Sequence, residues 1–142
     1  MRLISEKDFG MAIREMMASS PGLRRIFPTL TAPSFARDLK RCWRILEGQV
    51  TQGFIMERKP DERFVQFGST EILIAVHPAH RRQGVATWAV KRLLESLDDA
   101  FLIVSPGNKA AHALFSVMKG LKQIQESPEA RVFTQTGDLA KR

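Results

Sequence analysis

The sequence predicts a mixed α/β fold organised as one domain over residues 1–142. The chain length falls within the roughly 100–200 residues that one domain takes. The stretch Ile72–Val76 is apolar at every position, which is typical of a central strand covered on both faces. After it, apolar residues recur every four positions from Val85 to Leu97, which indicates an amphipathic helix. A buried strand followed by such a helix is the basis for the α/β assignment.

The first third of the chain is expected to form a short strand and a helix. Met1–Ile4 suits a strand, and apolar residues at helical spacing from Phe9 to Met17 indicate a helix that ends at Pro21. Residues 34–39 can add one or two helical turns.

The chain then changes to the two-residue period of strands. Alternation that stops at Gly48 and a second run from Val50 to Met56 predict a β-hairpin. A turn follows, and residues 64–76 are expected to be extended, with a break at Gly68.

The C-terminal part is expected to continue with a strand, a helix and two closing strands. Phe101–Val104 reads as a second short buried strand, and Asn108 begins a helix with Gly120 just beyond its end as a C-cap. The final strands are Leu121–Gln125 and Arg131–Thr136. The predicted order is therefore β-α-α-β-β-β-α-β-α-β-β.

The composition excludes several classes of protein. No apolar run reaches the roughly 18 residues that span a bilayer, and acidic residues interrupt the N-terminus where a signal peptide would be apolar. The single cysteine, Cys42, cannot form an internal disulfide, and Cys and His are too few for a structural zinc site. We therefore expect a cytoplasmic protein with no metal and no membrane partner.

The formal charge of +7 is concentrated in one segment. Residues 21–44 hold six basic side chains and one acidic one. Such a segment attracts nucleic acid, an anionic partner or a phosphorylated cofactor, and a solvated helix face explains it equally well. No nucleic-acid motif accompanies it, so the charge does not by itself indicate a nucleic-acid partner.

The loop between the buried strand and its helix carries the most informative residues. It is basic at Arg81 and Arg82, and the helix begins at Gly84 followed by small residues. The first N–H groups of a helix lack intrahelical acceptors, and the helix dipole leaves partial positive charge there. Because Gly84 has no Cβ, a diphosphate can reach these N–H groups. The loop therefore predicts an anion-binding cradle.

These residues resemble the cofactor signature of the GCN5-related N-acetyltransferase (GNAT) family, Q/R-x-x-G-x-G/A, at Arg81-Arg82-Gln83-Gly84-Val85-Ala86. A later run is similar to the family's N…A…Y…G pattern, at Asn108, Ala111, Phe115 and Gly120. The predicted topology is also similar to that of the family over nearly the whole chain. The resemblance implies the GNAT fold with splayed central strands, and acetyl-CoA or another acyl-CoA as co-substrate.

The resemblance also implies where the cofactor binds. Its pantetheine arm would lie between the strand that ends near Val76 and the strand Phe101–Val104, and its diphosphate would sit on the N–H groups of residues 82–87. Asn108 would bond the cofactor as its helix begins, or serve only as an N-cap. The implied cofactor-binding residues are Ala75, Val76, Arg81, Arg82, Gln83, Gly84, Val85, Ala86, Thr87 and Asn108.

Phe115 departs from the family pattern, in which a tyrosine commonly protonates the departing thiolate. Phe cannot donate a proton, the chain has no tyrosine, and the apolar stripe around Phe115 favours core packing. The strand before Asn108 has no ionisable group either. We therefore assign no catalytic residue from the sequence.

Weaker candidates for a base or nucleophile remain. Glu71 begins the strand that would carry the cofactor, but its spacing to the cofactor loop is one residue off the spacing expected for a general base. Because side chains alternate along a strand, this difference can turn Glu71 to the face away from the reaction. The histidines titrate in the useful range, yet His77, His80 and His112 are expected to be exposed. Cys42 has no His or acid beside it in sequence and is not expected to act as a nucleophile.

Two functions of different kinds stay open. The first is direct acyl transfer from acyl-CoA to a small-molecule or protein amine, with residues 19–41 building the acceptor site. The second is a catalytically inactive member of the fold that binds protein partners, for example a structural or internal component of a bacteriophage virion. Loss of the tyrosine supports the second function, and the cofactor loop supports the first.

Overall fold

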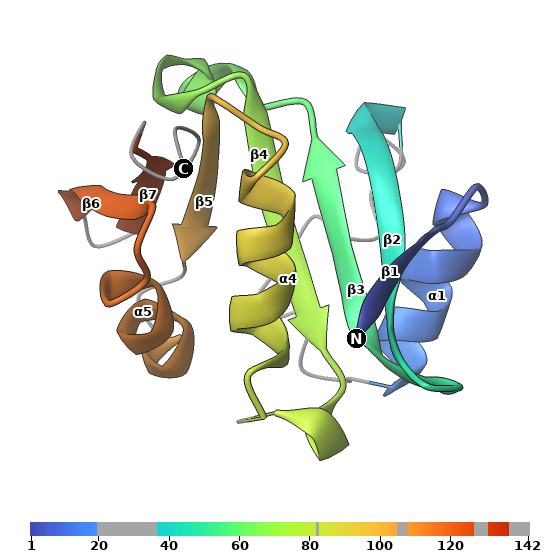
Figure 1. The fold of residues 1–142 in the computed structure, drawn as a ribbon. Helices are drawn as coiled ribbons and strands as arrows, with labels where there is room; N and C mark the ends of the chain where they lie inside the picture. The colour runs from blue at the N-terminus through green and yellow to red at the C-terminus, as the bar shows by residue number, and fades with distance from the viewer. Residues whose placement is uncertain (20–36, 82, 105–107, 127–130, 137–142) are drawn as a thin grey trace.

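Seven strands form one mixed sheet in the order β1-β2-β3-β4-β5-β7-β6 (Figure 1). The computed structural model describes residues 1–19, 37–81, 83–104, 108–126 and 131–136. The strands are β1 (Arg2–Ser5), β2 (Leu39–Glu47), β3 (Val50–Arg58), β4 (Thr70–Val76), β5 (Ala100–Val104), β6 (Leu121–Glu126) and β7 (Arg131–Gln135). The helices are α1 (Phe9–Ser19), α4 (Val85–Leu94) and α5 (Lys109–Ser116), and the 3-10 helices are η1 (Glu62–Phe67) and η2 (Pro78–His80).

This architecture confirms the predicted mixed α/β class. The strands and helices expected in the described residues appear in the predicted order, and the β2–β3 hairpin turns at Gly48, whose φ is 60°. Of residues 34–39, for which helical turns were predicted, 37 and 38 are helical, Leu39 begins β2, and 34–36 lie outside the described residues, as does Pro21.

Residues 64–67 correct the sequence prediction, because they are helical and not extended. The Asp61 side chain accepts a hydrogen bond from the Arg63 N–H (3.0 Å), and the Phe64 N–H donates to the Asp61 carbonyl (2.8 Å). These contacts begin η1, so that β4 starts only at Thr70. The aromatic residues that suggested a strand instead stack on one another, with the Phe64 and Phe67 rings 6.1 Å apart.

Two helices end earlier than the sequence suggested. Helix α4 ends at Leu94, and α5 ends at Ser116, with Val117 as its C-cap. Gly120 is therefore not the C-cap that was predicted. It has a φ of 97° in the turn before β6, and its carbonyl accepts the Thr136 N–H at 2.9 Å.

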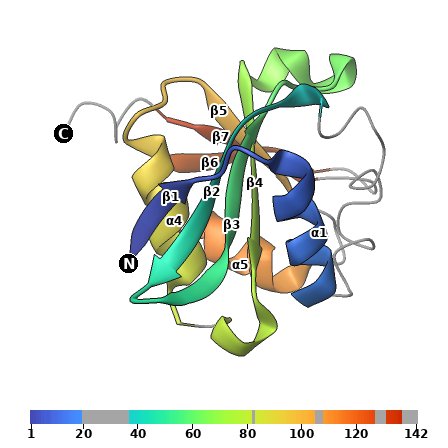
Figure 2. The ribbon, with the colours of Figure 1, turned by 90° about the vertical axis from the view of Figure 1, so that its right-hand side faces the viewer.

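The helices cover the sheet from both sides. Figure 2 shows α1 and α4 on opposite faces of the central strands. Because side chains alternate along β4, Ile72 (2% exposed) packs in the cluster that includes α4, and Leu73 (3% exposed) packs in the cluster that includes α1. The continuous apolar run of this strand thus follows from its cover on both faces, as predicted.

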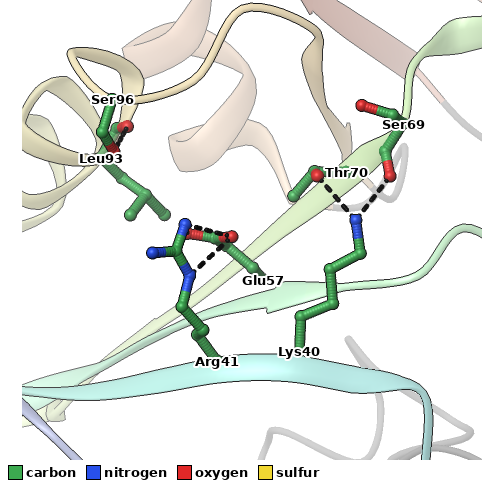
Figure 3. A network of polar contacts seen from close by, with 7 residues as sticks. All are labelled: Lys40, Arg41, Glu57, Ser69, Thr70, Leu93 and Ser96. Carbon is green, nitrogen blue, oxygen red and sulfur yellow. Dashed lines mark hydrogen bonds and ion pairs between the residues drawn. The ribbon is translucent and has the colours of Figure 1, made fainter.

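Part of the basic segment is neutralised by ion pairs. Arg44 pairs with Glu6 (2.6 Å) and with Glu15 of α1, and it donates to the Thr51 hydroxyl. Arg41 makes a bidentate pair with the buried Glu57, in which Nε donates to Oε1 (3.1 Å) and Nη2 donates to Oε2 (2.7 Å; Figure 3). These two cations therefore tie the sheet together. Within the described part of the chain, no helix is long and apolar enough to cross a membrane.

The parallel pair β4–β5 positions the candidate site. The two strands pair only at Thr70 with Ala100 and at Glu71 with Phe101. We call these two residue pairs the closed end. Beyond it β4 and β5 diverge (Figure 1), so that the remaining residues of β4 are not paired with β5.

Candidate functional site

The diverging part of β4 presents backbone groups on the side that faces β5. The His77 N–H donates to the Gln52 carbonyl of β3 at 2.7 Å. Since backbone groups alternate in direction along an antiparallel strand, Ala75 also turns its N–H and C=O to β3, whereas Ile74 and Val76 turn theirs toward β5. The Val76 carbonyl accepts a hydrogen bond from Arg81 Nε at 3.2 Å.

This geometry refines the set of residues drawn from the sequence. Val76 turns its N–H and C=O toward the open side of β4, while the backbone of Ala75 is occupied in the β3–β4 ladder. Ile74 is a residue that the sequence reasoning missed. The two-residue period of the strand, counted back from Val76, was the signal that could have found it.

The loop after β4 is ordered by its own histidines. His77 Nδ1 accepts the Ala79 N–H at 3.2 Å, the His80 N–H donates to the His77 carbonyl at 2.8 Å, and the two rings are 5.6 Å apart. The expectation that both histidines are exposed is wrong. They are half-buried, because His77 is the N-cap of η2 and His80 is its last residue. They hold the loop in shape next to the start of α4.

Helix α4 has Gly84 as its N-cap, and its first amide groups lack acceptors within the helix. Gly84 has φ 77° and ψ 9°, in the left-handed region that favours glycine, and makes no side-chain cap. The first bond back along the helix runs from the Trp88 N–H to the Gly84 carbonyl (3.0 Å), so the amides of Val85, Ala86 and Thr87 have no intrahelical acceptor.

The space in front of Gly84 is open. Among the described residues, no heavy atom lies within 4 Å of the position that a Cβ on Gly84 would take. Gly84 and Gln83 are exposed, while Arg82 lies outside the described residues. An anion can therefore approach the first amides of α4 without displacing a described side chain.

Asn108 occupies the start of α5 as its N-cap. Its Oδ1 accepts the Ala111 N–H at 3.2 Å, and the residue is half-buried. This contact is the N-cap role that the sequence left open beside cofactor binding.

Phe115 is a core residue, as predicted. It is 3% exposed, and its ring packs edge-on against Phe133 of β7 with the centroids 6.0 Å apart. The expectation that His112 is exposed is wrong. It is half-buried, with Nε2 3.1 Å from Gln123 Oε1 and its ring 5.7 Å from that of Phe133, because β6 and β7 lie beside this helix.

Two further ionisable residues are buried. Cys42 is 1% exposed, and burial raises the pKa of its thiol to about 12, which leaves it unreactive at neutral pH. Glu71 is 7% exposed and lies at the closed end, on the same face as Leu73. Burial raises the pKa of Glu71, while Arg58 opposes this shift from 3.5 Å.

A family model described as the acetyltransferase (GNAT) family matches residues 12–118. The chain belongs to the GNAT family. The match includes β4, the loop before α4, and both Asn108 and Phe115, so it covers the residues that carried the resemblance in the sequence except Gly120. A comparison with curated proteins finds no match for this GNAT chain.

Solved structures of acetyltransferases share the fold. An acetyltransferase from Agrobacterium tumefaciens str. C58 aligns with a TM-score of 0.64 at 19% identity, covering 95% of this chain and 88% of that one. A mutant of the spermidine N-acetyltransferase SpeG from Vibrio cholerae aligns with a TM-score of 0.70 at 12% identity, covering 99% and 96%. A putative phosphinothricin N-acetyltransferase aligns with a TM-score of 0.63 at 14% identity, covering 94% and 95%. At these identities the likeness concerns the fold alone.

Proposed function

We propose that this GNAT protein transfers an acyl group from acetyl-CoA, or another acyl-CoA, directly to an amine. The observation that carries the proposal is the open side of β4 next to the start of α4. The strand backbone that turns toward β5 and the first amides of α4, which lack intrahelical acceptors, lie next to each other there, in a chain of the acetyltransferase family.

The residues fit an acyl-CoA by chemistry as well as by position. The amides of residues 83–87 are donors suited to a diphosphate, and Gly84 leaves room for it. The backbone groups of Ile74 and Val76 are suited to the amides of a pantetheine arm laid along β4, as an added strand would be. Arg81 lies between these two regions and bonds the Val76 carbonyl. Bound there, acyl-CoA would supply an activated thioester.

The direction of β4 supports a position for the reacting end of the cofactor. An arm that enters beside Gly84 and follows β4 backwards from Val76 reaches the closed end, where Glu71 is buried. A carboxyl group whose pKa is raised by burial is suited to take up the proton that an ammonium acceptor must lose. We therefore propose Glu71 as the candidate general base.

The thiolate leaves without a protein acid in this proposal. Phe115 carries no proton to donate and is packed in the core. Since a thiol has a pKa of about 8.5, its thiolate can depart near neutral pH and take its proton from water. The expected consequence is slow but measurable transfer.

The acceptor is proposed at the level of a class. The structurally similar proteins named above include a spermidine N-acetyltransferase and a putative phosphinothricin N-acetyltransferase. The segment expected to build the acceptor site, residues 19–41, lies mostly outside the described residues. We therefore propose an amine of a small molecule or of a protein.

A second function remains supported by one observation. The buried Phe115, in a chain without tyrosine, is what a member of the fold that has lost catalysis would show. In that role, the protein would bind protein partners, for example in a virion.

Calorimetry and a thiol-release assay test the proposal. The protein is titrated with CoA and with acetyl-CoA, and free thiol is then followed with acetyl-CoA and a panel of amines. We expect micromolar binding of both ligands and thiol release that depends on the added amine. No binding up to millimolar concentrations would overturn the acyl-CoA assignment, whereas binding without transfer to any amine would favour the non-catalytic function.

A further inference from the structure

The closed end of the β4–β5 pair is held by contacts beyond its two residue pairs. Ser69 precedes β4 and Asp99 precedes β5. The Ser69 N–H donates both to the Asp99 carbonyl (3.0 Å) and to Asp99 Oδ2 (3.1 Å). Asp99 therefore links the residue before β4 to the residue before β5, next to the point where the two strands begin to diverge.

Side chains from two other strands reinforce this contact. Lys40 of β2 reaches past β3, where its Nζ donates to the Ser69 carbonyl and to the Thr70 hydroxyl, both at 2.9 Å (Figure 3). From β7, Gln135 Oε1 accepts the Ala100 N–H at 3.2 Å. We call Lys40, Asp99 and Gln135, with the groups they bond, the clamp.

Close packing leaves no space between the strands at this point. A Cβ on Gly68 would lie 2.5 Å from the Asp99 carbonyl oxygen and 3.0 Å from Phe101 Cδ1. The side chains of the closed end are themselves buried, at Thr70, Glu71, Ala100 and Phe101. The divergence of β4 and β5 therefore has a firm end and cannot continue without breaking the clamp.

We infer that the clamp limits the acyl group to a short chain and acts as the specificity-determining feature for acyl length. This inference rests on the proposed function, in which the arm lies along β4 with its acyl group toward the closed end. An acetyl group fits a site that ends there. A medium-length acyl chain would have to separate Ser69 from Asp99 and Thr70 from Ala100, and so lose their hydrogen bonds.

The dependence of affinity on chain length distinguishes an open site from a closed one. Where an apolar pocket continues, each added methylene raises affinity by about fourfold. Where the site is closed, added methylenes give no such gain, and forcing the strands apart lowers affinity. We therefore expect octanoyl-CoA to bind about tenfold more weakly than acetyl-CoA, a difference of about 1.4 kcal/mol.

The test measures dissociation constants for CoA, acetyl-CoA, butanoyl-CoA and octanoyl-CoA by calorimetry. The first variant is Gly68→Ala, whose new methyl group pushes Asp99 away and acts as a wedge. The second is Asp99→Ala, which loosens the clamp without a wedge in case the first does not fold. Asp98→Ala is the matched control, since Asp98 is the neighbouring exposed aspartate and no part of the clamp.

In both clamp variants we expect the ratio of the octanoyl-CoA to the acetyl-CoA dissociation constant to fall by about threefold or more, a change of at least about 0.6 kcal/mol. The affinity for CoA itself should change little, because the diphosphate site is at the other end of β4. Amide hydrogen exchange without ligand should speed up at residues 69–71 and 99–101 in the variants and not in Asp98→Ala.

The outcomes separate this inference from the proposed function. If the unmodified protein binds no CoA, both fail. If CoA binds but octanoyl-CoA binds as tightly as acetyl-CoA, only the inference on chain length fails. The inference on chain length also fails if amide hydrogens exchange faster in the clamp variants but the ratio of the octanoyl-CoA to the acetyl-CoA dissociation constant stays as in the unmodified protein.

Discussion

Replacing Gly84 by alanine tests the diphosphate cradle against a control of the same kind elsewhere in the chain. Gly84 (φ 77°) and Gly48 (φ 60°) both adopt left-handed conformations, and no described heavy atom lies within 4 Å of either Cβ position. Gly84 lies at the start of α4, whereas Gly48 lies in the β2–β3 turn. The two substitutions therefore introduce similar backbone strain at different places.

The strain sets the expected loss of stability. A side chain in the left-handed region costs about 1–2 kcal/mol, so each variant should unfold about 3–8 °C lower than the original protein. Because nothing surrounds either Cβ position, no packing cost is added. Thermal unfolding followed by circular dichroism should show similar shifts for Gly84→Ala and Gly48→Ala.

Affinity for CoA should separate the two variants. In the proposed site the diphosphate lies at Gly84 and the first amides of α4, so a methyl group on Gly84 would take space that the diphosphate needs, and each hydrogen bond to a charged group that is lost costs about 1.5–3 kcal/mol. Losing one such bond weakens CoA binding by about tenfold or more, as measured by calorimetry at a temperature where both variants are folded. Equal CoA affinities for Gly84→Ala and Gly48→Ala would refute the cradle.

Three other expectations concern the stability of the fold and the buried thiol. The hydrogen bond from Arg44 holds the pKa of Glu15 below its usual value, so the Glu15 carboxylate stabilises the fold above about pH 4.5 and this stabilisation is lost as the pH falls further. The unfolding temperatures at pH 6 and pH 3 should therefore differ more for the original protein than for Glu15→Gln. Equal differences for the two proteins would contradict this expectation. Gln135→Leu removes the side-chain partner of the Ala100 N–H and of the Leu97 carbonyl, and one of the two donors to the Leu94 carbonyl, which keeps the Leu97 N–H; it should cost about 2–4 kcal/mol in urea unfolding. A loss below about 1 kcal/mol would show that water replaces these bonds. Cys42, with its pKa raised to about 12, should react with iodoacetamide at pH 8 only when the protein is unfolded, and mass spectrometry that finds it alkylated in the folded protein would contradict its burial.

The sequence was sufficient for the elements whose signal is local. Ile72–Val76 carried its own pattern as a strand covered on both faces, and Gly84 carried the signal of a glycine-opened helix. The 3-10 helix η1 was missed because its aromatic residues also suit a strand, although Asp61 followed by Arg63 was a readable capping signal. The residues of β4 and Gly84 each favour one local conformation, whereas the aromatic residues of η1 are compatible with a strand as well as with a helix.

The clamp could not have been predicted, because its contacts join residues far apart in the chain. Lys40 and Thr70 are thirty residues apart, as are Ser69 and Asp99, and Ala100 meets Gln135 only after β7 has returned to the sheet. No periodic pattern encodes such contacts. The two-residue period groups Ile74 with Val76, but the side of β4 to which both turn their backbone groups depended on knowing the pairing with β3.

The position of Trp88 gives the protein a built-in optical reporter. Its backbone N–H bonds to the Gly84 carbonyl, its side chain is half-buried, and only one other tryptophan, Trp43, is present in a chain without tyrosine. In a Trp43→Phe background, ultraviolet-excited emission would come from the first turn of α4 alone. Ligand arrival at that turn could then be timed by stopped-flow fluorescence, with no dye attached.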